Sequence, residues 1–584
     1  MKTVILNIFK ILLLLLALFF LELNKNTIYG WLLTLAVITV YVFVRRTYKV
    51  SDLLLIPACL LLFVLIVYIS WPPYRLSKAV ANRNPKVSEV VTTRYGKVRG
   101  VLNKDESVAV YAGIPYAKPP VGDLRFKEPQ NPASYEGTLI TDHFMSKSMQ
   151  STSVPFFNSF VRLFVYHDYE ISLDDNYLEP VSEDSLYLNI WKPNKDVKDL
   201  PVVVFVHGGS LQNGSGYSKD NNGENLAKQD VIYVTLNYRL GAFGFLADEE
   251  LIKESKNGST GNYGLLDVIK ALEWINGNIA SFGGDPNNVT LAGESAGSVL
   301  VSALCTSPLA EGLFKRVVLE SSTVASKIPP HSYRSLESAL ASGRELKKRY
   351  NISSIEELRK IDAKNLIRED QSQHHITVDG YALLEDPYLS YRKGIHNEEA
   401  IFHGCNSKES GPFILFDQAS LKNYEHKLRN YFGDYADRIL ELYPATTDKE
   451  ARENWALIYG AIFFNYSHYC LNRLALENDI PVYEYYFSKD NNAIGPWHSG
   501  EMIYLYDNIP ERSLVYNRSD KELSEAMSSY LINFAKTGNP NGKDLLEWPL
   551  NSDNKTLLNF DENIGVIDEK MLDLYAVFDE FYGF

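Results

Sequence analysis

Hydrophobic residues follow two different patterns along this chain. The first 71 residues contain three long apolar runs, and each run is about as long as a helix that crosses a bilayer. These runs predict a membrane anchor of about three transmembrane helices within residues 1–72. Lys10 interrupts the first run, and a signal peptide is the alternative interpretation of that run. The three runs are Val4–Leu21, Ile28–Val44 and Leu53–Trp71.

Basic residues near these runs predict the orientation of the anchor. Three of them fall between the second and third runs, in residues 45–49, whereas only Lys25 separates the first two runs. Loops rich in lysine and arginine stay in the cytoplasm. We therefore expect the N-terminus and residues 45–49 on the inner side of the cytoplasmic (plasma) membrane. Everything after Trp71 is then extracellular.

After the anchor, short apolar runs alternate with helical periodicity. Residues 73–90 are polar and contain prolines, which predicts a linker, and residues 91–584 read as one domain without repeats. In residues 261–279, apolar side chains recur at spacings of three and four, which predicts a helix. The alternation predicts an α/β fold with a central, mostly parallel sheet flanked by helices. The expected strands are Pro201–Val206, Val231–Leu236, Val289–Ala292, Arg316–Glu320, Glu399–His403 and Val482–Phe487.

The composition of this domain argues against nucleic-acid binding and against a disulfide framework or a metal site. The first 83 residues hold nine of the 58 lysines and arginines but only two of the 72 aspartates and glutamates, so the remainder has a net charge of −21. An acidic domain argues against nucleic-acid binding. The four cysteines are scattered, which indicates buried free thiols and neither a disulfide framework nor a metal site.

Candidate chemistry lies at the carboxyl ends of the expected strands, where parallel sheets place their sites. The sequence GESAG, residues 293–297, follows the strand that ends at Ala292 and precedes an apolar helical stretch. This is the nucleophile-elbow pattern G-x-S-x-G, whose glycines permit a tight turn from strand to helix. The pattern alone is weakly specific, so its position between strand and helix supports Ser295 as a nucleophile.

A serine nucleophile needs a base, and the base needs an orienting acid. Glu409 follows the strand that ends at His403, and His498 follows the strand that ends at Phe487. This gives the chain order serine, acid, histidine that a nucleophile elbow requires. His403 precedes the acid and is therefore in the wrong order, and other histidines fall in helical or polar stretches.

With these residues placed, the chain resembles the type-B carboxylesterases, the cholinesterase/carboxylesterase family of α/β-hydrolases. The matching motifs stand in order over nearly all of residues 91–584, which makes the resemblance highly specific. They are YAGIPYAKPPVGDLRF (Tyr111–Phe126), SEDSLYLNIWKP (Ser182–Pro193), LNYRLGAFGFL (Leu236–Leu246), GNYGLLD, FGGDP (Phe282–Pro286), GESAG, WHSGEM and FAKTGNPN (Phe534–Asn541).

The resemblance implies a role for each candidate residue. It implies an oxyanion hole of backbone N–H groups after the strand that ends at Val206. It also implies supporting positions beside the nucleophile and after the next strand. The implied catalytic triad is Ser295, Glu409 and His498; the oxyanion hole is Gly209, Ser210 and Ala296; the supporting residues are Gly208, Glu294 and Ser321.

Two positions depart from the family pattern. Ser210 stands where the family has a third glycine, as it also does in the neuroligins, the adhesion members of the superfamily that lack the nucleophile. Serine keeps the backbone N–H and fits there provided that its backbone avoids positive φ. Ser185 replaces a family cysteine, so the usual disulfide of that region is not expected.

These observations predict a membrane-anchored carboxylic ester hydrolase that acts through an acyl-enzyme on a small-molecule ester. Neither a cofactor nor a metal ion is expected. Two alternatives remain open: a catalytically silent adhesion or binding protein of the neuroligin type, and an acyltransferase that shares the acyl-enzyme.

Overall fold

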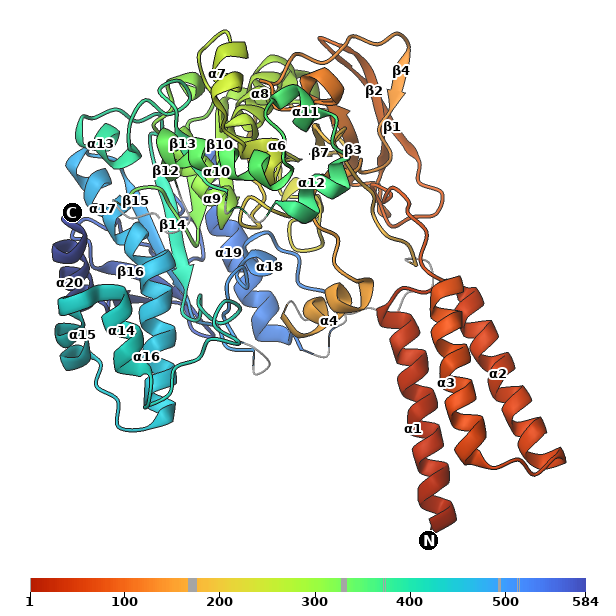
Figure 1. Cartoon of the computed structure of the whole chain (residues 1–584). Coiled ribbons are helices and arrows are strands. Elements are labelled where there is room, and N and C mark those ends of the chain that lie inside the picture. The colour runs from red at the N-terminus through yellow and green to blue at the C-terminus, as the bar shows by residue number, and fades with distance from the viewer. Residues whose placement is uncertain are drawn as a thin grey trace. The chain divides into compact units, whose positions relative to one another are not determined.

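The structure is a computed structural model, and it describes residues 2–165, 176–326, 333–370, 372, 374–491, 495–511, 513 and 515–584. The chain forms two compact units, which we describe separately (Figure 1). The first comprises Met1–Ser77 and Thr152–Pro180, and the second comprises Lys78–Ser151 and Val181–Phe584.

Three apolar helices dominate the first unit. They are α1 (Lys2–Leu23), α2 (Ile28–Thr47) and α3 (Asp52–Ile69), and within the described residues each is long and apolar enough to cross a membrane. They match the three runs expected from the sequence. Lys10, which interrupts the first run, is paired: its Nζ lies 2.8 Å from Oδ2 of Asp52 at the start of α3. This ion pair offsets much of the cost of burying the charge in an apolar bundle.

The first unit also contains residues that the sequence assigned to the esterase domain. Helix α4 (Pro155–Val165) packs against α1, with the ring of Phe156 stacked on Phe20 at 4.9 Å. Asn176 Nδ2 donates to the carbonyl of Asn26 at 2.8 Å. These contacts join residues far apart in the sequence, which local patterns do not reveal. The predicted linker 73–90 is also too long, because strand β1 begins at Val87.

The second unit is built on one twisted sheet. Within the described residues this sheet has 13 strands in the order β1-β2-β3-β7-β9-β8-β10-β11-β14-β15-β16-β17, with β4 beside β2. The strands from β9 to β16 are parallel. The pairs β1–β2, β2–β3, β3–β7, β7–β9 and β16–β17 are antiparallel, whereas β4 pairs with β2 in parallel. The bounds are β1 Val87–Thr93, β2 Gly96–Leu102, β3 Val108–Pro115, β4 Thr138–Ile140, β7 Tyr187–Pro193, β8 Leu200–Val206, β9 Ile232–Leu236, β10 Gly284–Glu294, β11 Arg316–Glu320, β14 Ile401–Asn406, β15 Val482–Phe487, β16 Thr556–Phe560 and β17 Gly565–Asp568.

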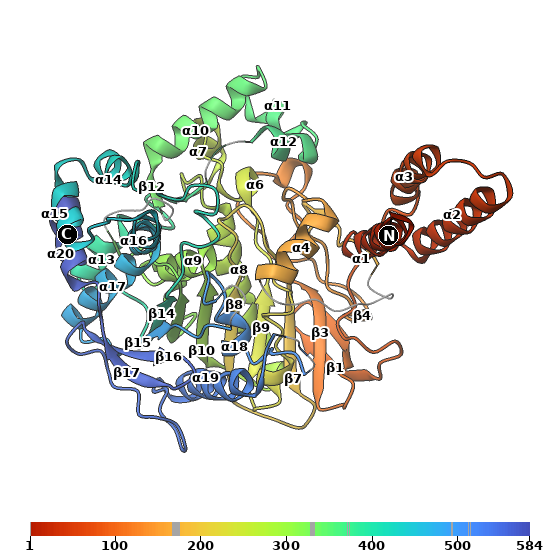
Figure 2. The same ribbon diagram turned by 90° about the horizontal axis from the view of Figure 1, so that it is seen from below.

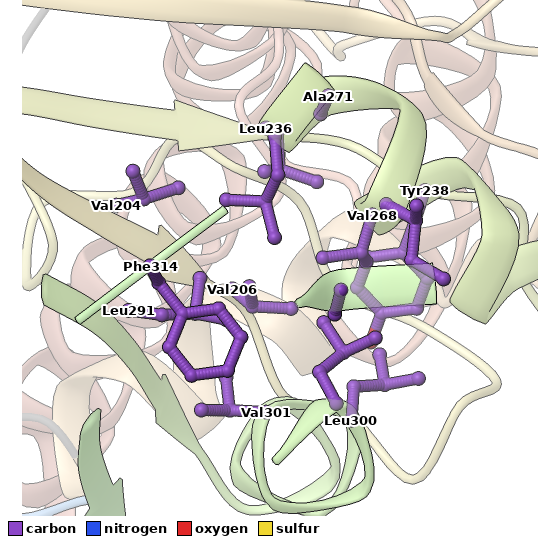
Figure 3. Packing of buried hydrophobic residues seen from close by; sticks show 14 of the residues in the cluster. Val204, Val206, Leu236, Tyr238, Val268, Ala271, Leu291, Leu300, Val301 and Phe314 are labelled. Atoms are coloured by element: carbon purple, nitrogen blue, oxygen red, sulfur yellow. The ribbon is translucent and has the colours of Figure 1, made fainter. Parts of the chain in front are cut away.

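Helices cover both faces of this sheet. Alternate side chains of each strand point to opposite faces, and in the central strands both sets are apolar and buried. In β8, Val204 and Val206 join the core formed with α8 (Tyr263–Asn278) and α9 (Ala296–Leu304) (Figure 3). Val203 and Phe205 join a second core with α19 (Arg518–Thr537). Figure 2 shows the parallel strands side by side with helices on either side of them. The fold is that of an α/β-hydrolase, as the sequence predicts.

A helical layer with its own hydrophobic core packs beside the sheet, around Phe432, Trp455 and Phe578. Two short strand pairs, β5–β6 and β12–β13, lie outside the large sheet. The other strands and α-helices of the second unit are β5 Lys147–Ser148, β6 Val181–Ser182, β12 Tyr333–Ser335, β13 Ile376–Val378, α5 Glu224–Ala227, α6 Gly241–Phe245, α7 Glu249–Glu254, α10 Leu336–Arg349, α11 Ile355–Arg359, α12 Ala363–Glu369, α13 Pro387–Arg392, α14 Tyr424–Phe432, α15 Ala436–Leu442, α16 Asp448–Gly460, α17 Tyr466–Glu477, α18 Met502–Leu505 and α20 Leu572–Tyr582.

Candidate active site

Ser295 occupies a strained turn between β10 and α9. Its backbone has φ 56° and ψ −125°, and its N–H donates to the carbonyl of Glu320 on the neighbouring strand at 2.9 Å. The flanking glycines are sterically required: a Cβ on Gly297 would lie 2.0 Å from the carbonyl oxygen of Val206, and one on Gly293 would lie 2.5 Å from the carbonyl carbon of Gly297. The sequence therefore forms the elbow that the motif predicts, with the serine hydroxyl at the start of α9.

The structure brings Ser295, His498 and Glu409 together from three separate parts of the chain. His498 Nε2 lies 2.8 Å from Ser295 Oγ, and His498 Nδ1 lies 2.6 Å from Glu409 Oε2. Glu409 follows β14 and His498 follows β15, so neighbouring parallel strands deliver both residues to the carboxyl edge of the sheet. The other oxygen of Glu409 accepts the N–H of Asn406 at 2.7 Å, which fixes the carboxylate.

Buried carboxylates set the electrostatics around His498. Burial disfavours the imidazolium, but the nearby carboxylates of Glu294 and Glu409 outweigh it and raise the pKa of His498 to about 9. Glu294 Oε1 lies 3.3 Å from His498 Nε2 and accepts a hydrogen bond from Ser499 Oγ at 2.6 Å. Burial in turn raises the pKa of Glu294.

The loop after β8 carries the expected oxyanion donors. Gly209, Ser210 and Leu211 all have positive φ, at 109°, 55° and 59°. The condition set for Ser210, a backbone that avoids positive φ, is therefore not met, because three consecutive residues take the left-handed region to turn the loop. Serine reaches this region at a cost that glycine does not have. The carbonyl of Gly209 accepts N–H groups from Gln212 and Asn213, which closes the turn.

This loop lies directly against the nucleophile elbow. A Cβ on Gly208 would lie 2.7 Å from the carbonyl oxygen of Glu294 and 2.9 Å from Cβ of Ser295. Within the described part of the chain, the N–H groups of Gly209, Ser210 and Ala296 donate to no protein acceptor. Ala296 is the first residue of α9, so its N–H has no partner within the helix. These three groups are available to a ligand oxygen.

Glu501 is a third buried carboxylate at the site, and the sequence patterns did not predict its role. Ser321 Oγ lies 3.2 Å from Glu501 Oε1, and the side-chain amide of Asn406 donates to the other oxygen of Glu501. Asn406 thus connects Glu501 to Glu409. Burial, together with the charges of Glu409 and Glu294, raises the pKa of Glu501 to about 8. The sequence feature that could have pointed to Glu501 is its position three residues after His498, within the motif WHSGEM.

Two aromatic rings flank the imidazole of His498, and the sequence patterns did not predict them. The ring of Phe464 lies 4.7 Å from that of His498, and the ring of Phe413 lies 5.2 Å away. Phe464 belongs to a π-helical turn, Ala461–Asn465, between α16 and α17. Such turns are common at functional sites, but the sequence gives no local sign of this one.

His207, which directly follows β8, takes a structural position. Its Nδ1 lies 2.8 Å from the carbonyl of Gly208, its ring stacks on Tyr238, and burial lowers its pKa to about 4.

Among the described residues, no cluster of three or more histidine, cysteine, aspartate or glutamate side chains could hold a metal ion. The three cysteines of the second unit are buried free thiols.

The fold and the elbow define the α/β-hydrolase class, and comparison with known proteins specifies the family. Residues 87–574 match the carboxylesterase family, and the chain belongs to it. It is 32% identical over 513 residues to the fumonisin B1 esterase of Sphingopyxis macrogoltabida, covering 83% of this chain and 88% of that protein. It is 29% identical over 528 residues to neuroligin-3 of Mus musculus, covering 77% of this chain and 62% of that protein. The crystal structure of the Geobacillus stearothermophilus carboxylesterase EST55 at pH 6.2 has a TM-score of 0.71 and 30% identity, covering 84% of this chain and 99% of that one.

Proposed function

We propose that this chain is a membrane-anchored serine ester hydrolase with the triad Ser295, His498 and Glu409. The observation that carries the proposal is the pair of short contacts made by His498, at 2.8 Å to Ser295 Oγ and at 2.6 Å to Glu409 Oε2. Nucleophile, base and orienting acid lie within hydrogen-bond reach, as acyl transfer requires. Esterase relatives such as the fumonisin B1 esterase support a small-molecule ester as the substrate.

The first half of the reaction forms an acyl-enzyme. Ser295 Oγ attacks the ester carbonyl carbon while His498 Nε2 takes its proton. Glu409 accepts the Nδ1–H of the imidazole, which fixes the tautomer and stabilises the imidazolium. The backbone N–H groups of Gly209, Ser210 and Ala296 donate hydrogen bonds to the negatively charged carbonyl oxygen and stabilise it. When the intermediate collapses, the protonated imidazole gives its proton to the departing alkoxide, and the alcohol leaves.

The second half releases the acid. Water takes the place of the alcohol, His498 Nε2 removes its proton, and the hydroxyl oxygen attacks the acyl carbon. The same three N–H groups stabilise the second tetrahedral intermediate, and Ser295 recovers its proton when the carboxylic acid leaves. If an alcohol replaces water in this half, the product is a new ester. This is the acyltransferase alternative, and adding an alcohol acceptor and identifying the product measures it.

The decisive test replaces the nucleophile in the full-length protein in detergent or nanodiscs. We expect Ser295→Ala to reduce kcat/KM for p-nitrophenyl butyrate by on the order of 10⁴-fold or more. The exposed Ser353 provides the matched control, because Ser353→Ala removes a hydroxyl far along the sequence from the elbow. Equal rates for Ser295→Ala and wild type would overturn the assignment.

The neuroligin relative supports a second candidate, an adhesion protein on the same fold. Ser210, shared with the neuroligins by resemblance, is the residue that favours it. A fluorophosphonate probe separates the two, since it reacts only with an activated serine. Covalent labelling at Ser295 supports the hydrolase, whereas a folded protein that never labels supports the adhesion candidate.

A further inference from the structure

Helix α4 (Pro155–Val165) exposes an aromatic face. Three phenylalanines recur at spacings of three and four, which places them on one side of the helix: Phe157, Phe160 and Phe164 are 60%, 43% and 49% exposed. Asn158, Ser159 and Arg162 fall on the other side of the helical wheel. Large exposed aromatic faces mark an interaction surface.

The rings of α4 continue a row that starts on a candidate membrane span. Phe20 of α1 stacks on Phe156 at 4.9 Å, Phe156 stacks on Phe160 at 6.2 Å, and Phe160 contacts Phe164 at 4.4 Å. Figures 1 and 2 show α4 running across the axis of α1, beside its C-terminal end. A helix in this position lies along the surface of a bilayer that α1 crosses.

The depth of the contact fits the membrane–water boundary. Phe20 precedes the last residue of α1, Leu23, by three positions, which is about 4.5 Å along a helix. Interfacial helices bury their apolar face about 5–10 Å into the boundary between headgroups and acyl chains. The contact between α1 and α4 therefore lies at the depth that such helices occupy.

Aromatic residues mark the same level on the other two spans. Tyr29 stands at the start of α2, Tyr68 at the end of α3, and Trp71 just beyond it, and all three are exposed. Tyrosine and tryptophan gather where membrane meets water. The segment after α4 returns to this level too, because Asn176 binds the carbonyl of Asn26 and Lys25 lies over the ring of Tyr177.

We propose that α4 is an interfacial membrane helix, with its phenylalanine face inserted into the outer leaflet beside the three spans. The occupant of this face is the lipid bilayer, because the row of rings is continuous with a bilayer span and lies level with an aromatic belt. The segment Thr152–Pro180 is then a part of the anchor inserted within the esterase sequence. The inference rests on the proposed membrane anchoring, and it is independent of the proposed catalysis.

Site-directed spin labelling of the full-length protein in nanodiscs of phosphatidylcholine and phosphatidylglycerol tests this inference. A Cys59→Ser background removes the cysteine of α3, and the other three cysteines are buried. Single nitroxides replace Phe157, Phe160 or Phe164. A label at Asn158 is the matched control on the opposite side of α4, and a label at the exposed Leu16 of α1 is the reference within a span. The measurement compares accessibility to oxygen, which concentrates in lipid, with accessibility to the water-soluble Ni(II)EDDA complex.

We expect the three phenylalanine positions to favour oxygen, with a ratio between those of Leu16 and Asn158. Preference for Ni(II)EDDA at all three positions would overturn the inference. So would exclusion of both reagents, because the face would then be covered by protein, such as a second copy of the chain. If Leu16 itself does not favour oxygen, the anchoring proposal fails and this inference falls with it. If Leu16 lies in lipid and the phenylalanines do not, only the interfacial helix is wrong.

Discussion

At the scale of single residues, the candidate site contains several strained backbone positions. Ser210, Ser295, Ser321 and Ser499 are all non-glycine residues with positive φ. Each such residue costs roughly 1–3 kcal/mol, so the surrounding structure must hold it in place. Here the strain holds Ser295 and Ser210, the proposed nucleophile and one proposed oxyanion donor, and two serines that hydrogen-bond to buried glutamates.

The strained backbone of Ser210 predicts different effects for two substitutions at this position. Ser210→Gly removes the side chain from a left-handed position, and we expect thermal stability to stay equal or to rise by up to about 1 kcal/mol, since the flexibility of glycine offsets part of the gain. Ser210→Val places a β-branched residue there, and both stability and kcat should fall. The thermal midpoint and the hydrolysis rate of the full-length protein measure this. A valine variant that behaves like wild type would show that the loop does not hold this conformation.

Glu294 gives a prediction about pH. The raised pKa of His498, about 9, means that the neutral imidazole needed as a base becomes available as pH rises through that value. Glu294→Gln removes a negative charge 3.3 Å from Nε2, so the pKa of His498 should fall. We expect the rising limb of kcat/KM to move to lower pH by about one unit or more. Glu294→Asp, which retains the charge, is the control; an unmoved limb in the glutamine variant would contradict the electrostatic role of Glu294.

At the scale of elements, local sequence patterns predict the central parallel strands and the turn at Ser295. The six expected strands all lie in the large sheet, and the elbow forms where GESAG places it, because buried parallel strands are continuous apolar runs and the elbow needs its glycines. The sequence patterns did not predict the other strands of this sheet, β1 to β4, β7, β16 and β17. Asn406, Glu501 and Phe464 were missed because their roles depend on contacts across the fold, which one sequence does not display.

Gly297 gives a prediction about how elements pack. A Cβ there would meet the carbonyl oxygen of Val206 at 2.0 Å, so Gly297→Ala must push α9 away from β8. We expect a loss of about 1–3 kcal/mol in stability, together with lower kcat because α9 carries the N–H of Ala296. Gly565→Ala is the matched control, since a Cβ at Gly565 meets nothing within 4 Å. Equal thermal midpoints for the two variants would contradict the close packing.

At the scale of the whole molecule, the sequence order and the structural units do not coincide. The sequence places everything after residue 90 in one domain, whereas Thr152–Pro180 belongs to the unit of the membrane helices. The physical reason is contact between segments more than a hundred residues apart, as between Asn176 and Asn26.

The orientation of the anchor gives the last prediction. Arg45 and Arg46 end α2 and belong to the basic cluster between spans, so the loop after α2 should stay in the cytoplasm and three spans then place the second unit outside. Arg83 is exposed between α3 and β1. We expect trypsin added to intact cells or spheroplasts to cut within residues 78–86 and to yield a fragment that carries a C-terminal tag, while an N-terminal tag and a cytosolic marker stay protected. Detection by size is required, because an interfacial α4 would keep the cut fragment on the membrane. An Arg83→Gln variant should shift or slow the cut, and a fragment that appears only after the membrane is ruptured would reverse the proposed orientation.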